Sequence, residues 1–100
     1  MDLYSLTGAA LIELLGNKLK ELRIDSNMTQ VELAESAGVG ISTVREAEKG
    51  RNISIAKLVQ ILRALRRLDL LEPFLAPKPV SPLAMAQIQN SVKPRKRVRK

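Results

Sequence analysis

No other stretch constrains the fold of this chain as much as residues 29–50, TQVELAESAGVGISTVREAEKG. Glu32 follows Thr29 by three residues at the start of an apolar-periodic run, which is the capping-box pattern of a helix start. Gly38 stands where that helix must end, and glycine can adopt the left-handed conformation that such an end uses. Gly50 is placed to end a second helix. The pattern predicts two short helices joined by a tight turn.

The apolar residues of this stretch are small where two crossing helices must touch. The positions expected to face inward are Leu33, Ala34, Ala37, Val44 and Ala47, with Val39 in the turn. Packing of this kind buries one side of the second helix and leaves its other side exposed. An exposed helix of this size fits the DNA major groove. The arrangement therefore favours a helix-turn-helix.

The same residues resemble the Cro/CI-type helix-turn-helix of the Xre family of bacterial and phage regulators. Ala34, Gly38 and Val44 stand where that motif has a small residue, a turn glycine and a buried branched residue. Gln30 opens the motif, and residues 48–50 (EKG) match its closing Glu-x-Gly. The resemblance implies an all-α fold, namely a five-helix lambda-repressor-like DNA-binding domain.

The resemblance covers residues 15–75, and the rest of the chain falls into three further segments. We expect an N-terminal helical segment (1–14), the Cro/CI-type helix-turn-helix domain (15–75), a Pro-containing linker with a short docking helix (76–92) and an extended basic C-terminal tail (93–100). Leucines of the first segment share one face with Leu19 and Leu22. This segment therefore either continues into the first helix of the domain or kinks near Gly16.

Two further helices are expected after the motif. Ser54 is a good N-cap, and apolar residues at 58, 61, 62 and 65 have the spacing of an amphipathic helix. A short fifth helix is expected over residues 69–75. In the region that follows Pro73, the prolines Pro77, Pro79 and Pro82 are expected to break regular structure.

The composition argues against an enzyme. The chain has no cysteine and no histidine among its 100 residues, so the usual zinc ligands, nucleophiles and general bases are missing. No stretch approaches the ~20 apolar residues of a membrane span. We therefore expect no catalytic residue, no metal, no cofactor and no membrane partner.

The net charge of +7 is concentrated at the C-terminal end. The tail bases are Lys93, Arg95, Lys96, Arg97, Arg99 and Lys100. Removing these six from the seventeen bases leaves eleven against ten acids in residues 1–92, a net charge of +1. The tail is either a solubilising end or an arm that binds DNA phosphates without regard to sequence.

The outward residues near the start of the second motif helix are the candidates for base contacts. They are Ile41, Ser42, Arg45 and Glu46, and the family uses these positions in this way. Arg45 can donate two hydrogen bonds to guanine, and Glu46 can accept one from a cytosine amine. The alternative is that Arg45 and Glu46 are solvated surface charges. Ile41 stands where a polar residue is commoner, and Gly40 replaces the usual Ser or Thr cap.

The resemblance also implies which residues contact phosphates and which pair is structural. The phosphate candidates are Gln30, Thr43, Lys49, Arg51 and Asn52. Arg23 and Glu48 resemble the family's pair that links the first helix to the third. We expect this pair to stabilise the fold without contacting DNA.

One such module makes few contacts, so we expect a homodimer on a palindromic operator with half-sites ~34 Å apart. The expected dimer interface comprises Leu68, Leu71, Phe74 and Leu75. These residues are more apolar than a short terminal helix requires for its own core. Two alternatives remain: all four belong to the core, or the leucine-rich N-terminal segment forms the contact.

The expected function is sequence-specific binding of double-stranded DNA by an autorepressor in the bacterial cytoplasm and nucleoid. The overall organisation further resembles HipB-like antitoxins, whose partners are HipA-like kinase toxins. A phage repressor and a restriction-modification controller compete within the same class. An adaptor that binds protein or RNA through the same fold is the alternative class. Tyr4 and Phe74, the only aromatic residues, lie outside the basic tail and give no evident base-stacking platform.

Overall fold

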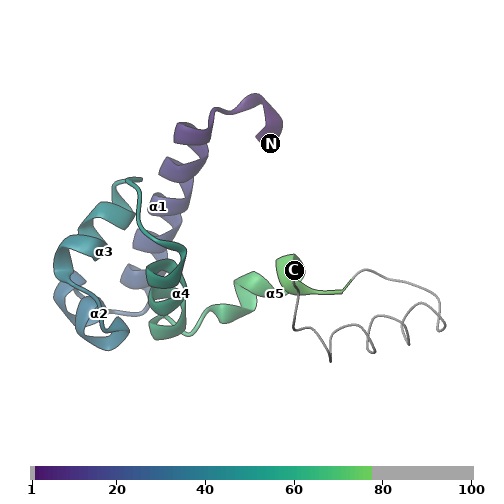
Figure 1. Cartoon of the computed structure of the whole chain (residues 1–100). Helices are drawn as coiled ribbons and strands as arrows, with labels where there is room; N and C mark the ends of the chain where they lie inside the picture. The colour runs from purple at the N-terminus through teal and green to yellow at the C-terminus, as the bar shows by residue number, and fades with distance from the viewer. Residues whose placement is uncertain (1, 78–100) are drawn as a thin grey trace, which may run out of the picture.

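The computed structural model describes residues 2–77, which form a bundle of helices (Figure 1). In chain order the elements are the 3-10 helix η1 (Leu3–Ser5), α1 (Gly8–Asp25), α2 (Gln30–Ala37), α3 (Ile41–Glu48), α4 (Ile55–Ala64), the 3-10 helix η2 (Leu68–Leu71) and α5 (Glu72–Leu75). Residues 2–77 contain no strand, and none of their helices combines the length and apolarity of a membrane span. The expected all-α fold with five α-helices is confirmed.

Helices α1 to α4 pack around one apolar core. Helix α2 contacts both α3 and α4, and α1 contacts α3. Leu33 on α2, Val44 on α3 and Ile61 on α4 are at most 1% exposed and form the centre of this core. The other buried apolar side chains are Leu19, Leu22, Ala34, Ala37, Ala47, Leu62 and Leu65. Every position expected to face inward from α2 and α3 is therefore buried.

The ends of α2 and α3 are set by local hydrogen bonds and glycines. The Thr29 hydroxyl accepts a hydrogen bond from the Glu32 N–H at 3.0 Å, and the Glu32 carboxylate accepts one from the Thr29 N–H at 2.9 Å. Gly38 ends α2 in the left-handed conformation with a φ of 71°, and Gly50 follows α3 with a φ of 77°. The expected capping box and both glycine stops are confirmed.

Helix α1 runs from Gly8 to Asp25 as one element, so the N-terminal segment continues into the first helix of the domain. Thr7 caps its start by accepting a hydrogen bond from the Ala10 N–H at 3.0 Å. Gly16 does not interrupt the helix. A Cβ atom at this position would lie 2.5 Å from the Ala47 carbonyl oxygen, so glycine lets α1 cross the end of α3.

The chain after α4 differs from the expected single fifth helix. Residues 68–71 form η2, and α5 covers only Glu72–Leu75. Pro73 lies in the first turn of α5, and the helix ends at Leu75, two residues before Pro77. A proline is tolerated in the first turn since the missing N–H group has no helical partner. The other linker residues from 78, the expected docking helix and the basic tail lie outside the described residues.

Candidate nucleic-acid interface

Helix α3 turns one side to the core and the opposite side to solvent. Its buried residues are Val44, Ala47 and Glu48. Ser42 and Arg45 are exposed. Gly40 caps α3 with an extended backbone and without a side-chain hydrogen bond, an arrangement that glycine supports well at this position. The structure therefore leaves the central candidates for base contacts accessible.

The other two base-contact candidates have neighbours within the protein. Ile41 is half-buried and packs against the core, so only part of its side chain can meet a thymine methyl group. Glu46 is half-buried, and its carboxylate lies 3.8 Å from the Arg51 guanidinium. This pairing reduces the repulsion that a carboxylate meets near DNA phosphates.

The phosphate candidates lie before, on and after α3. Gln30 begins α2 and is half-buried, as is Thr43 on α3, whereas the residues after α3 are exposed: Lys49, Arg51 and Asn52. A hollow between α3 and the start of α4 is lined by Ser42, Thr43, Glu46, Asn52, Ile53, Ser54 and Lys57. This hollow brings together two candidates for base contacts and two for phosphate contacts.

Lys57 is a further candidate that the sequence pattern did not single out. It lies in the first turn of α4 and lines the hollow, and its N–H donates to the Ser54 hydroxyl at 3.1 Å. The first N–H groups of an α-helix have no helical partner, and a nearby lysine adds positive charge for a phosphate. The sequence signal that could have identified Lys57 is a basic residue placed three residues after the strong N-cap Ser54.

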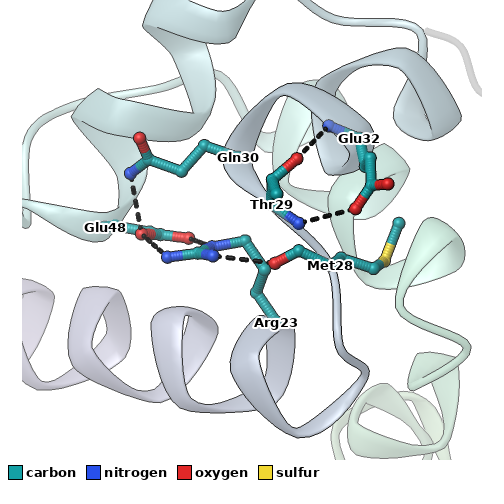
Figure 2. A network of polar contacts seen from close by, with 6 residues as sticks. All are labelled: Arg23, Met28, Thr29, Gln30, Glu32 and Glu48. Atoms are coloured by element: carbon teal, nitrogen blue, oxygen red, sulfur yellow. Dashed lines mark hydrogen bonds and ion pairs between the residues drawn. The ribbon is translucent and has the colours of Figure 1, made fainter.

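A buried ion pair fixes the end of α3 against α1 (Figure 2). The Glu48 carboxylate accepts hydrogen bonds from Arg23 Nε at 2.6 Å and from Arg23 Nη2 at 3.2 Å. The Arg23 and Glu48 side chains are only 12% and 5% exposed. Arg23 Nη1 also donates to the Met28 carbonyl oxygen at 2.8 Å. This is the pair that the resemblance implies. Its two parallel hydrogen bonds fix the orientation of the guanidinium relative to the carboxylate, in addition to the attraction between their charges.

Gln30 extends the same network to α2. Its Nε2 donates to Glu48 Oε1 at 3.0 Å, and Figure 2 shows its carbonyl oxygen on the side away from Glu48. An amide nitrogen carries two N–H groups, so Gln30 can donate the second to a phosphate and keep the first on Glu48. The buried carboxylate therefore orients a side chain that is expected to contact DNA.

The residues expected to form the dimer interface divide into two pairs. Leu68 and Leu71 are half-buried and pack against the core. Phe74 and Leu75 are 87% and 69% exposed. The exposed pair on α5 is thus available to another molecule, whereas the first pair mainly attaches η2 to the bundle.

The comparison with protein families agrees with this geometry. The family model described as helix-turn-helix, HTH_3, matches residues 19–72, which is more than half of the chain. Its match begins within α1 and ends within α5, so it includes the whole of α2, α3 and α4. No protein of curated function gives a significant match. The chain belongs to the Cro/CI-type (Xre) helix-turn-helix family of DNA-binding proteins, a family without enzymatic activity.

Proposed function

We propose that this protein is a sequence-specific transcriptional regulator that represses its own gene by binding a palindromic operator as a homodimer. The observation that carries the proposal is the two-sided character of α3. Arg45 and Ser42 are exposed on one side, and the other side is held by Val44 in the core and by Glu48 in the ion pair with Arg23. A rigid helix with an exposed arginine suits the major groove.

Base recognition depends mainly on Arg45. Its guanidinium can donate two hydrogen bonds to guanine O6 and N7, and Ser42 can adapt to several bases. Glu46 accepts from a cytosine amine once Arg51 turns from its carboxylate, 3.8 Å away, to a phosphate. Because Ile41 is half-buried, the remaining specificity depends on DNA shape.

Affinity requires more positive charge than the described domain supplies. Seven of the seventeen bases lie after residue 77, so residues 2–77 contain ten bases against ten acids. Gln30, Thr43, Lys49, Arg51, Asn52 and Lys57 position the domain on the backbone. The basic tail (93–100) then adds binding that is independent of sequence and sensitive to salt.

The homodimer contact involves the exposed side chains of α5. Phe74 and Leu75 expose large apolar side chains to water, and exposed apolar side chains of this kind often mark a contact with another protein. Two copies joined through these side chains place two α3 helices on one operator, with half-sites about one helical turn (~34 Å) apart. A palindromic operator follows from the two-fold symmetry of such a dimer.

Within this class, the role of a HipB-like antitoxin is the finer proposal. It is supported by the resemblance of the short domain, the proline-containing segment (76–92) and the basic end. The partner is then a HipA-like kinase toxin, which binds residues 76–92 or the outer face of the dimer. Co-expression with a neighbouring kinase gene and purification of a stable complex supports this role. A kinase that stays separate at micromolar concentrations contradicts it.

The test of the main proposal is selection of bound duplexes from a random DNA pool. The full-length protein and Arg45→Ala are compared at moderate salt. A palindromic consensus that the variant loses supports dimeric base recognition. Absence of a consensus, with binding that disappears when residues 93–100 are removed, favours the adaptor that binds protein or RNA.

A further inference from the structure

The apolar stripe of α1 is longer than the bundle on which it packs. The stripe consists of Gly8, Leu11, Ile12, Leu15, Gly16, Leu19 and Leu22, on one side of successive turns. Its second half from Gly16 is buried, but Leu15 is 58% exposed and Ile12 is also exposed. Figure 1 shows the first half of α1 projecting past the other helices. Within residues 2–77, about two turns of apolar helix therefore lack a covering element.

A groove lies beside this uncovered half, and we call it the α1 groove. It is lined by Ile12, Leu15, Gly16 and Leu19 of α1 and by Ala47, Arg51, Asn52, Ile53 and Leu58 on the facing side. Apart from Arg51 and Asn52, these residues have no polar side chain. The groove and the projecting half of α1 share Ile12 and Leu15, so they form one continuous apolar surface.

The charges around this surface favour a protein as its occupant. Residues 2–17 carry Asp2 and Glu13 and no base. An N-terminal segment with two carboxylates and no base is repelled by DNA phosphates. Its exposed leucines instead gain free energy by leaving water against another apolar surface. Glu13 follows Ile12 in the sequence, and Arg51, which has the opposite charge, lines the α1 groove.

The surface contains both a projecting apolar helix and an apolar groove, which are the two parts that a contact between two copies requires. A two-fold axis near Ile12 and Leu15 would lay the first half of each α1 across the α1 groove of the other copy. The same operation would bring Glu13 of each copy towards the Arg51 guanidinium of the other, whose five N–H groups leave donors for Glu46 or a phosphate. Gly8 has no heavy atom within 4 Å of an added Cβ, so the start of the helix leaves room for close approach. We propose that the first half of α1 pairs with a second copy of this chain.

This pairing joins one dimer to the next. It rests on the proposed function, in which each dimer forms through α5 and binds DNA. Figure 1 shows α5 and the projecting half of α1 leaving the bundle at different places. One chain can therefore use both surfaces at once. Dimers on adjacent operators then contact each other through α1, and occupation of one operator raises the affinity for the next.

Sedimentation of the full-length protein tests this contact without DNA. Wild type is compared with Leu15→Glu and with the matched control Ile24→Glu, whose parent residue lies on the same helix and is 54% exposed. At a concentration where wild type and the control form dimers and tetramers, we expect Leu15→Glu to form dimers. The tetramer of Leu15→Glu is expected to require more than about tenfold higher concentration, because the interface must bury a charge.

Binding to duplexes with one or two operators completes the test. Leu15→Glu should bind a single operator like wild type but lose the cooperativity between two operators. Identical assembly of wild type and Leu15→Glu overturns the inference, as does a wild type that never exceeds a dimer. Conversion of Leu15→Glu to a monomer also overturns it, because α1 is then the dimer contact itself. Failure of all proteins to prefer operator DNA instead contradicts the proposed function, and the sedimentation result stands apart from it.

Discussion

The α2–α3 unit and the first half of α1 use similar apolar residues in opposite ways. In α2–α3, Leu33 and Val44 are fully buried, and the capping box and Gly38 set the ends of α2. In the first half of α1, Leu15 is exposed and the first buried residue is Gly16. Helical periodicity therefore identifies an apolar face but does not reveal whether the same chain covers it. The α2–α3 unit, which presents the DNA-binding helix, is held rigidly by the core. The exposed first half of α1 is suited to contact with another molecule.

The largest change in the free energy of unfolding is expected from loss of the ion pair that holds α3 against α1. Glu48→Ala leaves the Arg23 guanidinium without its buried partner, so we expect a loss of about 3 kcal/mol in the free energy of unfolding. Glu21→Ala removes the exposed pair with Lys18 and should cost less than about 0.5 kcal/mol. Urea denaturation of both variants measures the difference. Equal stabilities for the two variants would show that the ion pair with Arg23 does not support α3.

Two glycines of α1 give the next largest effect and compare the two halves of that helix directly. A Cβ at Gly16 would lie 2.5 Å from the Ala47 carbonyl oxygen, whereas one at Gly8 meets no heavy atom within 4 Å. Gly16→Ala should therefore lower the free energy of unfolding by about 1–2 kcal/mol, despite the better helix propensity of alanine. Gly8→Ala should leave it unchanged or slightly raised. Thermal unfolding of both variants measures this contrast, and a destabilised Gly8→Ala would mean that the first half is already packed.

A smaller effect is expected where the chain leaves α4. Arg66 has a φ of 61°, a left-handed conformation that costs free energy for a residue with a side chain. Arg66→Gly relieves this strain and should raise the free energy of unfolding by about 0.5 kcal/mol. Arg63→Gly, inside α4, is the control and should lower it by about 1 kcal/mol. Denaturation curves that show both variants destabilised to the same extent would contradict the assignment of strain to Arg66.

The smallest effect is a pH dependence at the start of η2. The hydrogen bonds and charge of Arg67 hold the pKa of the Asp69 carboxyl below its usual value. A lowered folded pKa adds stability above the unfolded value of ~3.9, and this stability is lost as the pH falls through the folded pKa. Both side chains are largely exposed, so the contribution is small. Asp69→Asn should remove this acid-dependent part of the unfolding curve, whereas an unchanged pH profile would show that the pair is too weak to matter.

Local signals made most of the α2–α3 unit predictable. The Thr29–Glu32 capping box, the Gly38 stop and the Ser54 cap are each encoded within a few residues, and all three occur in the structure. Inward positions such as Leu33 and Val44 followed from spacing, because their partners lie on the neighbouring helix of the same motif. The Arg23–Glu48 contact joins residues far apart in sequence, and only the family resemblance implied it.

Other features depended on contacts that no local pattern contains. Gly16 was a candidate kink until the structure showed its backbone against α3. The partial burial of Ile41 depends on the core beneath it. Lys57 becomes a candidate for phosphate contacts only when the start of α4 lies beside α3. The periodicity of residues 69–75 likewise did not predict the division into η2 and α5, in which Leu68 and Leu71 pack against the core.

Base recognition by α3 is tested by comparing Arg45→Ala with Lys49→Ala in binding to the selected operator and to a scrambled duplex. If α3 recognises bases through Arg45, Arg45→Ala should lose about tenfold or more of its affinity for the operator and little for the scrambled duplex. Lys49→Ala should weaken both complexes alike and reduce their salt dependence by about one phosphate contact. An unchanged ratio of operator to scrambled affinity in Arg45→Ala would contradict base recognition by α3.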